Sequence, residues 1–278
     1  MIILLAASAA LFAQSNGGSP DKPQNHSNVP DARQIVGPSI AATERSWQAR
    51  DHYTYMERDE DRRLDSRGRV KSEDVDVSRI ILVNGAPFEQ LVERNGQAPS
   101  AEEQRKQQDK LDKLKHETPE ERAARLRKGQ ENSSFREVPE AFDFQGIGEE
   151  VVNGRSAYVL QATPHPGYYA HDKYGKMLSK VEGKLWVDKQ DFGWVKVDGQ
   201  VTQPFSMGLF LARVLRGSHI TMEQIRVGDG IWMPKRIEVR ASAKILFIKS
   251  LDIDRILTYS DYRLAQTGSL RQETRRSQ

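Results

Sequence analysis

Apolar and polar residues alternate along most of this chain with the period of two that is typical of β-strands. Val75 and Val77 alternate with charged residues and lead into the apolar run at 80–83. Near the end of the chain one parity is mainly apolar, at Ile245, Phe247, Leu251, Ile253, Leu257 and Tyr259. This pattern predicts a sheet with one buried face.

Turn signals divide the alternating stretches into about ten strands, mostly antiparallel and joined by short turns. Asn84-Gly85 and Asn153-Gly154 are hairpin signals, and Gly228-Asp229-Gly230 marks another turn. The strands are expected at 53–64, 70–83, 87–94, 142–152, 155–163, 179–188, 194–203, 216–227, 231–243 and 244–259. The predicted fold is therefore mainly β: a large curved antiparallel sheet, or half-barrel, with a few short helices as a lid.

Helical patterns occur in two places. Residues 39–51 are expected to form a short helix with Ile40, Thr43 and Trp47 on one face. Residues 101–116 and 119–128 each follow a capping-box pattern, and Gly129 is expected to end the second helix. Seven acidic and nine basic residues in 101–128 leave only a thin apolar stripe, so we expect the insert at 100–128 to lie on the surface.

The N-terminal residues 1–13, MIILLAASAALFA, have the apolar and small composition of a secretory signal peptide and are too short to span a bilayer. Residues 14–38 are rich in Gly, Pro, Asn and Ser and are expected to form a flexible linker. The main domain is predicted at 39–264, and the polar, basic residues 265–278 at the C-terminus are expected to be a disordered tail. This organisation predicts a protein exported to the periplasm or secreted.

Composition narrows the function classes. The 42 basic and 39 acidic residues nearly cancel to a net charge of +3, which gives no support to nucleic-acid binding. The chain has no cysteine, which excludes thiol catalysis, disulfides and Cys-ligated zinc.

No motif of catalysis or of cofactor or metal binding is present. The sequence contains no GxSxG, P-loop, GxGxxG or HExxH pattern. His165 and His171, beside Asp172, are the only closely spaced histidines, and a solvated loop is the default interpretation of this segment. We therefore predict no catalytic residue, no metal site and no cofactor, and a protein that is not an enzyme.

Large apolar residues of the central hairpins are the candidates for ligand contact, as lining of an apolar concavity or its lid. These candidates are Trp186, Trp194, Phe205, Met207, Phe210, Leu211 and Trp232. The compact apolar stretch 205–215, FSMGLFLARVL, suits a lid or a lip that touches an acyl chain or a membrane surface. The other interpretation of this stretch is a connection that packs into the core.

Several segments together resemble the periplasmic lipoprotein-carrier superfamily with the LolA/LolB-like fold. They are GRSAYVLQATP at 154–164, GKLWVD at 183–188 and the later hairpin segment WMPK at 232–235. The resemblance covers about residues 39–264 and implies an incomplete barrel that holds a lipid or acyl chain against its apolar face, under a helical lid.

The resemblance implies an extracytoplasmic binding or carrier protein for a lipid or lipoprotein-like apolar ligand, with transient contact to a membrane surface. The alternative is a structural or regulatory interaction protein of the cell envelope, of the sensor type, with a protein partner. A hydrolase whose site residues the sequence does not reveal is a third hypothesis.

Overall fold

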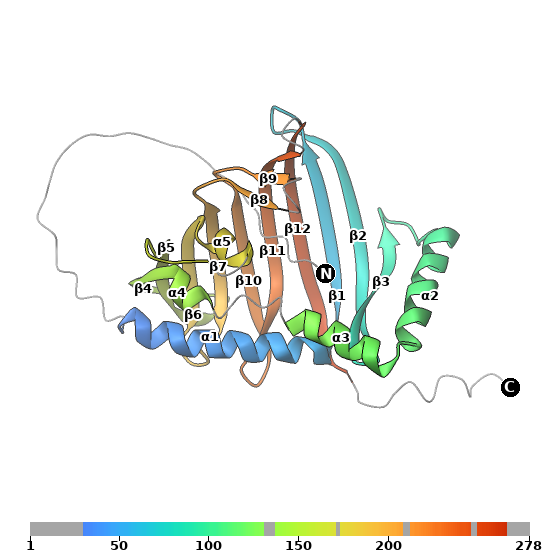
Figure 1. Ribbon diagram of the computed structural model, residues 1–278, viewed down its shortest axis with the longest axis horizontal. Coiled ribbons are helices and arrows are strands. Elements are labelled where there is room, and N and C mark those ends of the chain that lie inside the picture. The colour runs from blue at the N-terminus through green and yellow to red at the C-terminus, as the bar shows by residue number, and fades with distance from the viewer. Residues whose placement is uncertain (1–29, 131–136, 171–172, 208–211, 246–248, 266–278) are drawn as a thin grey trace, which may run out of the picture.

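The computed structural model describes residues 30–130, 137–170, 173–207, 212–245 and 249–265 (Figure 1). The prediction of a mainly β protein with one large antiparallel sheet and a few short helices is confirmed. The helices are α1 (Ala32–Ala49), the 3-10 turn η1 (Arg50–His52), α2 (Ala101–Lys115), α3 (Pro119–Gln130), α4 (Val138–Ala141) and α5 (Lys173–Leu178). The strands are β1 (Tyr53–Leu64), β2 (Val70–Val83), β3 (Ala86–Arg94), β4 (Phe142–Val152), β5 (Arg155–Pro164), β6 (Val181–Asp188), β7 (Trp194–Val201), β8 (Phe205–Met207), β9 (Ala212–Val214), β10 (His219–Gly228), β11 (Ile231–Ile245) and β12 (Lys249–Leu264).

All described strands belong to one 12-stranded sheet, in the order β3-β2-β1-β12-β11-β10-β7-β6-β5-β4. The short strands β8 and β9 lie off this path, where β9 pairs with β11. The end strands β3 and β4 do not pair with each other, so the sheet is open and not a closed barrel.

The predicted hairpin turns form as the sequence indicates. Asn84, Asn95 and Asn153 have φ angles of 51°, 49° and 52°, and each is followed by a glycine with φ of 74° to 78°. Consecutive left-handed residues make the turn whose twist matches that of the flanking strands. These turns fix the registers of β2 with β3 and of β4 with β5.

The last hairpin differs from the prediction. The boundary was expected between residues 243 and 244, but β11 continues to Ile245 and β12 begins at Lys249. Apolar residues occur on both sides of the expected boundary, so the alternation alone does not reveal a break in the strand. The stretch 205–215 supplies β8 and β9, and residues 208–211 between them lie outside the described residues.

Helix α1 is longer than predicted, because it begins at Ala32 and not at residue 39. Asp31 caps the helix by accepting a hydrogen bond from the N–H of Arg33 at 3.0 Å, and Pro38 is accommodated inside it. Part of the predicted linker 14–38 is therefore helical. The predicted signal peptide 1–13 and the rest of the linker up to residue 29 lie outside the described residues, as does the predicted tail from residue 266 on.

The buried side of α1 carries small polar residues that let the helix approach the sheet closely. Ser39, Thr43 and Ser46 are buried, and their hydroxyls donate to carbonyl groups one turn earlier in the helix. The Ser39 hydroxyl also accepts a hydrogen bond from Trp194 Nε1 at 3.2 Å, and that of Ser46 accepts one from the N–H of Trp232 at 3.0 Å. Helix α1 is thus hydrogen-bonded to β7 and β11.

Helix α2 stands beside the edge strand β3 (Figure 1), and none of its residues is buried. The predicted surface position of this helix is confirmed, as is its capping box between Ser100 and Glu103. The Gln107 amide accepts from the N–H of Leu91 at 2.7 Å and donates to its carbonyl oxygen at 3.4 Å. A side chain of α2 therefore occupies backbone groups that an edge strand would otherwise offer to another strand. Helix α3 passes through Gly129 to Gln130, so that glycine does not end it as predicted.

A buried ion pair ties β5 to the turn between β6 and β7. Arg155 donates to both carboxylate oxygens of Asp188, at 2.6 and 2.9 Å, and Asp188 is only 1% exposed. The backbone N–H groups of Gln190 and Asp191 donate to the same carboxylate at 2.9 and 2.8 Å. Burial alone would raise the pKa of Asp188, but these hydrogen bonds outweigh it and hold the pKa below its ordinary value.

Candidate functional site

The two faces of the sheet differ in what covers them. Consecutive residues of a strand point to opposite faces. Leu160 and Leu185 pack against α1, and we call their side of the sheet the inner face. Their neighbours Val159 and Trp186 belong to a separate cluster on the opposite, outer face.

The inner face has two apolar regions. The first, under α1, joins Ile35, Val36 and Ile40 of the helix to β5, β6 and β7. The second consists of strand residues alone, and we call it the strand cluster. Its buried members are Val201, Val214, Ile220, Ile237, Val239 and Ala241, and partly buried residues packed against it are Val181, Phe205, Met222, Ile253, Leu257 and Tyr259.

The strand cluster becomes more exposed towards β12. Val239 of β11 is 3% exposed, whereas Ile253 and Leu257 of the neighbouring β12 are only half-buried. Both β12 residues pair with inner-face positions of β11, so they continue the same apolar surface. Apolar side chains therefore remain accessible along β12 at Ile253 and Leu257, on either side of Arg255, which pairs with Val239 on the same face. We call these positions the β12 strip.

A buried carboxylic acid lies at the β1 end of this strip. Glu57 pairs across the sheet with Tyr259 and is 7% exposed. Burial, together with the charges of Glu89 and Asp59, raises the pKa of Glu57 to about 7. A hydrogen bond from Tyr259 and the charge of Arg255 oppose this rise. At neutral pH this carboxyl is therefore divided between its protonated and ionised forms.

The neighbours of Glu57 form a polar and aromatic margin beside the apolar strip. Arg255 pairs with Asp59 through two hydrogen bonds, one of them 2.7 Å from Nε to Oδ1. The ring of Tyr55 lies 5.9 Å from that of Tyr259 and 5.1 Å from that of Tyr262. An apolar strip that ends in hydrogen-bonding groups suits an amphipathic ligand.

The structure separates the tryptophans that the sequence suggested as ligand contacts. Trp194 is 7% exposed beneath α1 on the inner face. Trp186 and Trp232 are 6% and 2% exposed and pack together in the outer-face cluster. These three residues do not line a common surface, because the strand alternation puts Trp186 on the face opposite α1.

The remaining candidates lie near β8 and β9. Phe205 packs against the strand cluster, and Met207 is the last residue of β8. Phe210 and Leu211 lie outside the described residues. Of the predicted contacts, Phe205 is thus the one seen packed against the strand cluster, and its contact with a ligand stays a prediction.

Sequence reasoning missed Glu57, although a signal for it exists. Tyr53 and Tyr55 have the same parity in the predicted strand 53–64, and Glu57 is the next residue of that parity. A carboxylate that continues an aromatic row towards the buried face is unusual. That observation alone would have identified Glu57 as a candidate.

Of the segment that contains His165 and His171, the structure describes the part around His165. His165 Nδ1 lies 2.9 Å from a carboxylate oxygen of Asp143, while His171 and Asp172 lie outside the described residues. Within the described ranges, no group of three or more His, Asp or Glu side chains is placed to hold a metal ion. Nor does any described helix have the length and apolar composition that a membrane span requires.

No known protein family matches the sequence of the chain, and no curated protein sequence matches it. Among solved structures, the chain is similar to LolA-type folds. One is a putative outer membrane lipoprotein-sorting protein domain from Vibrio parahaemolyticus, with 14% identity, a TM-score of 0.32, and coverage of 84% of this chain and 94% of that one. Another is a LolA-superfamily protein from Nitrosomonas europaea, with 12% identity, a TM-score of 0.31, and coverage of 85% and 94%.

The MucA/MucB complex of Pseudomonas aeruginosa is also similar, with 12% identity, a TM-score of 0.22, and coverage of 82% of this chain and 99% of that one. The resemblance expected from the sequence thus recurs among these structures. At such identities and TM-scores the likeness gives no information about the ligand or the activity of this chain.

Proposed function

We propose that the chain is an extracytoplasmic binding or carrier protein that holds a lipid or lipoprotein-like acyl chain against the inner face of its sheet. The observation that carries this proposal is the composition of the strand cluster. All of its described members come from one sheet, and Ile253 and Leu257 remain half-buried at its margin.

The physical reason is that a single sheet layer does not bury its own face. Stable domains cover the apolar face of a sheet with a second layer. Helix α1 provides this layer over β5, β6 and β7, whereas the strand cluster is described without a helical residue. An apolar face of this kind favours binding of an apolar partner.

The polar margin gives a bound amphipath a direction. An acyl chain along Ile253 and Leu257 would pass over Arg255, which lies between them and pairs with Asp59, and its polar end would lie near Glu57. A protonated Glu57 can donate a hydrogen bond to that end, which an ionised carboxylate cannot do.

The first test replaces Leu257 by glutamine. We expect Leu257→Gln to weaken binding of a fluorescent fatty acid by roughly tenfold or more, since a polar amide replaces an apolar contact. The matched control is Ile256→Gln, because Ile256 is the next residue of β12 and points to the outer face beside Glu60 and Glu238. The Ile256→Gln variant should bind the fatty acid with the affinity of the unchanged protein.

A denaturant titration of the same two variants separates binding from folding. The proposal requires that Leu257→Gln lowers affinity more than its loss of stability explains. Unchanged affinity, or no fatty-acid binding by the unchanged protein, would favour the alternative of an envelope interaction protein whose inner face is covered by a protein partner.

We further propose that the chain reaches the periplasm or the exterior through a signal peptide at residues 1–13, which precedes a linker and the binding domain. The basis is the apolar leader and the polar segment after it. N-terminal sequencing of the mature protein should begin near Gln14. Recovery of the intact leader on soluble cytoplasmic protein would contradict this prediction.

A further inference from the structure

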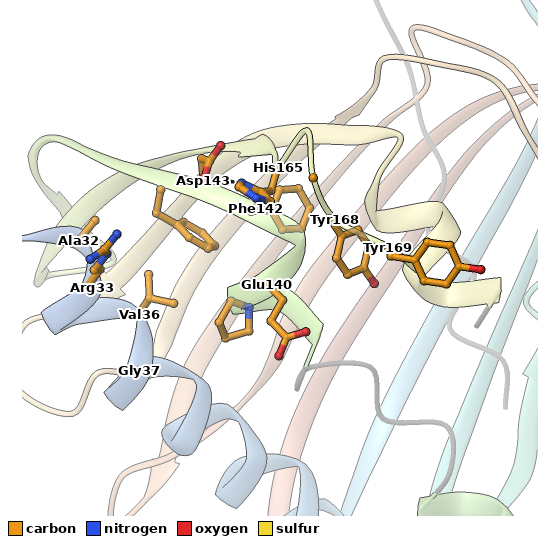
Figure 2. A pocket seen from close by; sticks show the side chains of 13 residues that line it. Ala32, Arg33, Val36, Gly37, Glu140, Phe142, Asp143, His165, Tyr168 and Tyr169 are labelled. Atoms are coloured by element: carbon orange, nitrogen blue, oxygen red, sulfur yellow. Dashed lines mark hydrogen bonds and ion pairs between the residues drawn. The ribbon is translucent and has the colours of Figure 1, made fainter. Parts of the chain in front are cut away.

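A cavity of about 740 Å³ opens between the first turns of α1, the start of β4 and the loop after β5 (Figure 2). Cavities of roughly 300–1,000 Å³ are typical of small-molecule sites. We call it the α1–β4 pocket. Its apolar lining includes Val36, Phe142 and Phe144, and its polar lining includes Arg33, Glu140 and His165. It is distinct from the strip on β12.

The loop that forms one wall of the pocket is held by hydrogen bonds. The N–H of His165 donates to the carbonyl oxygen of Ala141 at 2.9 Å, and the N–H of Tyr168 donates to that of His165 at 3.1 Å. The His165 ring is oriented by Asp143 at 2.9 Å, and the Tyr168 hydroxyl donates to the Glu137 carboxylate. The polar groups of the wall therefore have defined positions before a ligand arrives.

Two glycines make room for these rings. A Cβ atom at Gly167 would lie 3.2 Å from Nε2 of His165. A Cβ atom at Gly175 would collide with the Tyr168 hydroxyl and the Glu137 carboxylate. The chain thus approaches the side chains of this wall closely at both glycines.

An aromatic ring stands exposed at the edge of the pocket. Tyr169 is 82% exposed, and Figure 2 shows it beside Tyr168 at the side of the pocket away from α1. A flat, accessible ring can pack against the C–H face of a ligand while the ligand's polar edge stays in water.

The balance of charge indicates the class of ligand. Arg33 supplies hydrogen-bond donors and Glu140 supplies acceptors, whereas Asp143 and the ring of His165 bond to each other. A ligand with donors or acceptors alone would satisfy only one of these two lining groups. A neutral ligand rich in hydroxyl groups can hydrogen-bond to both kinds of group.

We infer that the α1–β4 pocket binds a saccharide, whose apolar ring face packs on Tyr169 and whose hydroxyls hydrogen-bond to Arg33 and Glu140. This inference is independent of the proposed acyl-chain site, because the two use different residues of the inner face.

The test is isothermal titration of the full chain with three neutral disaccharides: cellobiose, maltose and N,N′-diacetylchitobiose. Phenylacetate and phenethylamine serve as charged comparators. We expect at least one disaccharide to bind and to bind more tightly than either comparator. Tyr169→Ala should weaken that affinity roughly three- to tenfold, as expected for the loss of one aromatic contact.

Two further variants make the result specific. Glu140→Gln keeps the shape of the side chain and should also weaken binding, whereas Val151→Ala, at a 72%-exposed position near the other end of β4, should not. Melting curves establish that each variant is folded. Absence of binding by all three disaccharides, tighter binding of a charged comparator, or unchanged affinity in Tyr169→Ala would each overturn the inference.

Discussion

Glu57→Gln is expected to stabilise the protein at pH 8 by about 3 kcal/mol, because the unchanged protein must ionise a buried carboxyl at that pH. Burial raises the pKa of Glu57 from 4.5 to about 7. Between these two pH values the folded state holds a proton that the unfolded state releases. The free energy of unfolding therefore falls as pH rises through this window, in total by about 3 kcal/mol at 1.36 kcal/mol per pKa unit.

Urea denaturation at pH 4, 6 and 8 measures this effect. Glutamine is neutral and can still accept the hydrogen bond from Tyr259, so the variant should match the unchanged protein at pH 4 and exceed it at pH 8. The control is Glu60→Gln on the outer face of the same strand, where Glu60 pairs with Arg58 and Arg62. This control should lose up to about 1 kcal/mol at pH 8, a change of opposite sign. A Glu57→Gln variant without added stability at pH 8 would show that Glu57 is ionised there at no cost.

Asp188→Ala should have the largest destabilising effect, about 3 kcal/mol at pH 7, the lower end of the roughly 3–5 kcal/mol for breaking a fully buried ion pair, because Arg155 is 29% exposed. The change leaves Arg155 with its longer contacts to Gln190 and Asp191 and removes the acceptor for the N–H groups of those two residues. Tryptophan fluorescence is a suitable probe, because the Arg155 guanidinium lies 5.4 Å from the Trp232 ring.

Acid pH provides the second arm of this test. Since the pKa of Asp188 is lowered in the folded state, its contribution is complete above the unfolded pKa and is lost as pH falls through the folded pKa. The difference between the unchanged protein and Asp188→Ala should thus shrink below about pH 4. In a double-mutant cycle, Arg155→Ala and Asp188→Ala together should cost less than the sum of their separate effects. Strict additivity would mean that the pair contributes no coupling energy.

The strands were predictable because alternation and turn chemistry agree locally. Asn84-Gly85 and Asn153-Gly154 adopt the left-handed angles that their sequence favours, and β1, β2 and β4 have the predicted bounds. Helix α1 was predicted too short because Gly37 and Pro38 have poor helix propensity, and packing on the sheet overrides it.

The arrangement of the candidate site was less predictable. In 185–187 the three consecutive residues Leu185, Trp186 and Val187 are all large and apolar, so periodicity does not reveal which of them faces α1. The structure puts Leu185 and Val187 on the inner face and Trp186 on the outer face. A buried strand with apolar residues on both faces carries no sequence signal for its orientation.

The two edge strands of the sheet, β3 and β4, differ in whether another strand can pair with them. Gln107 of α2 occupies the N–H and C=O groups of Leu91 on β3, whereas β4 ends the strand order at the other side. Apart from the three-residue β8, strand addition to the described sheet is therefore directed to β4. Two copies joined through β4 would each present the α2-covered edge outward, so such an assembly would end at a two-fold dimer and would not polymerise into a fibre.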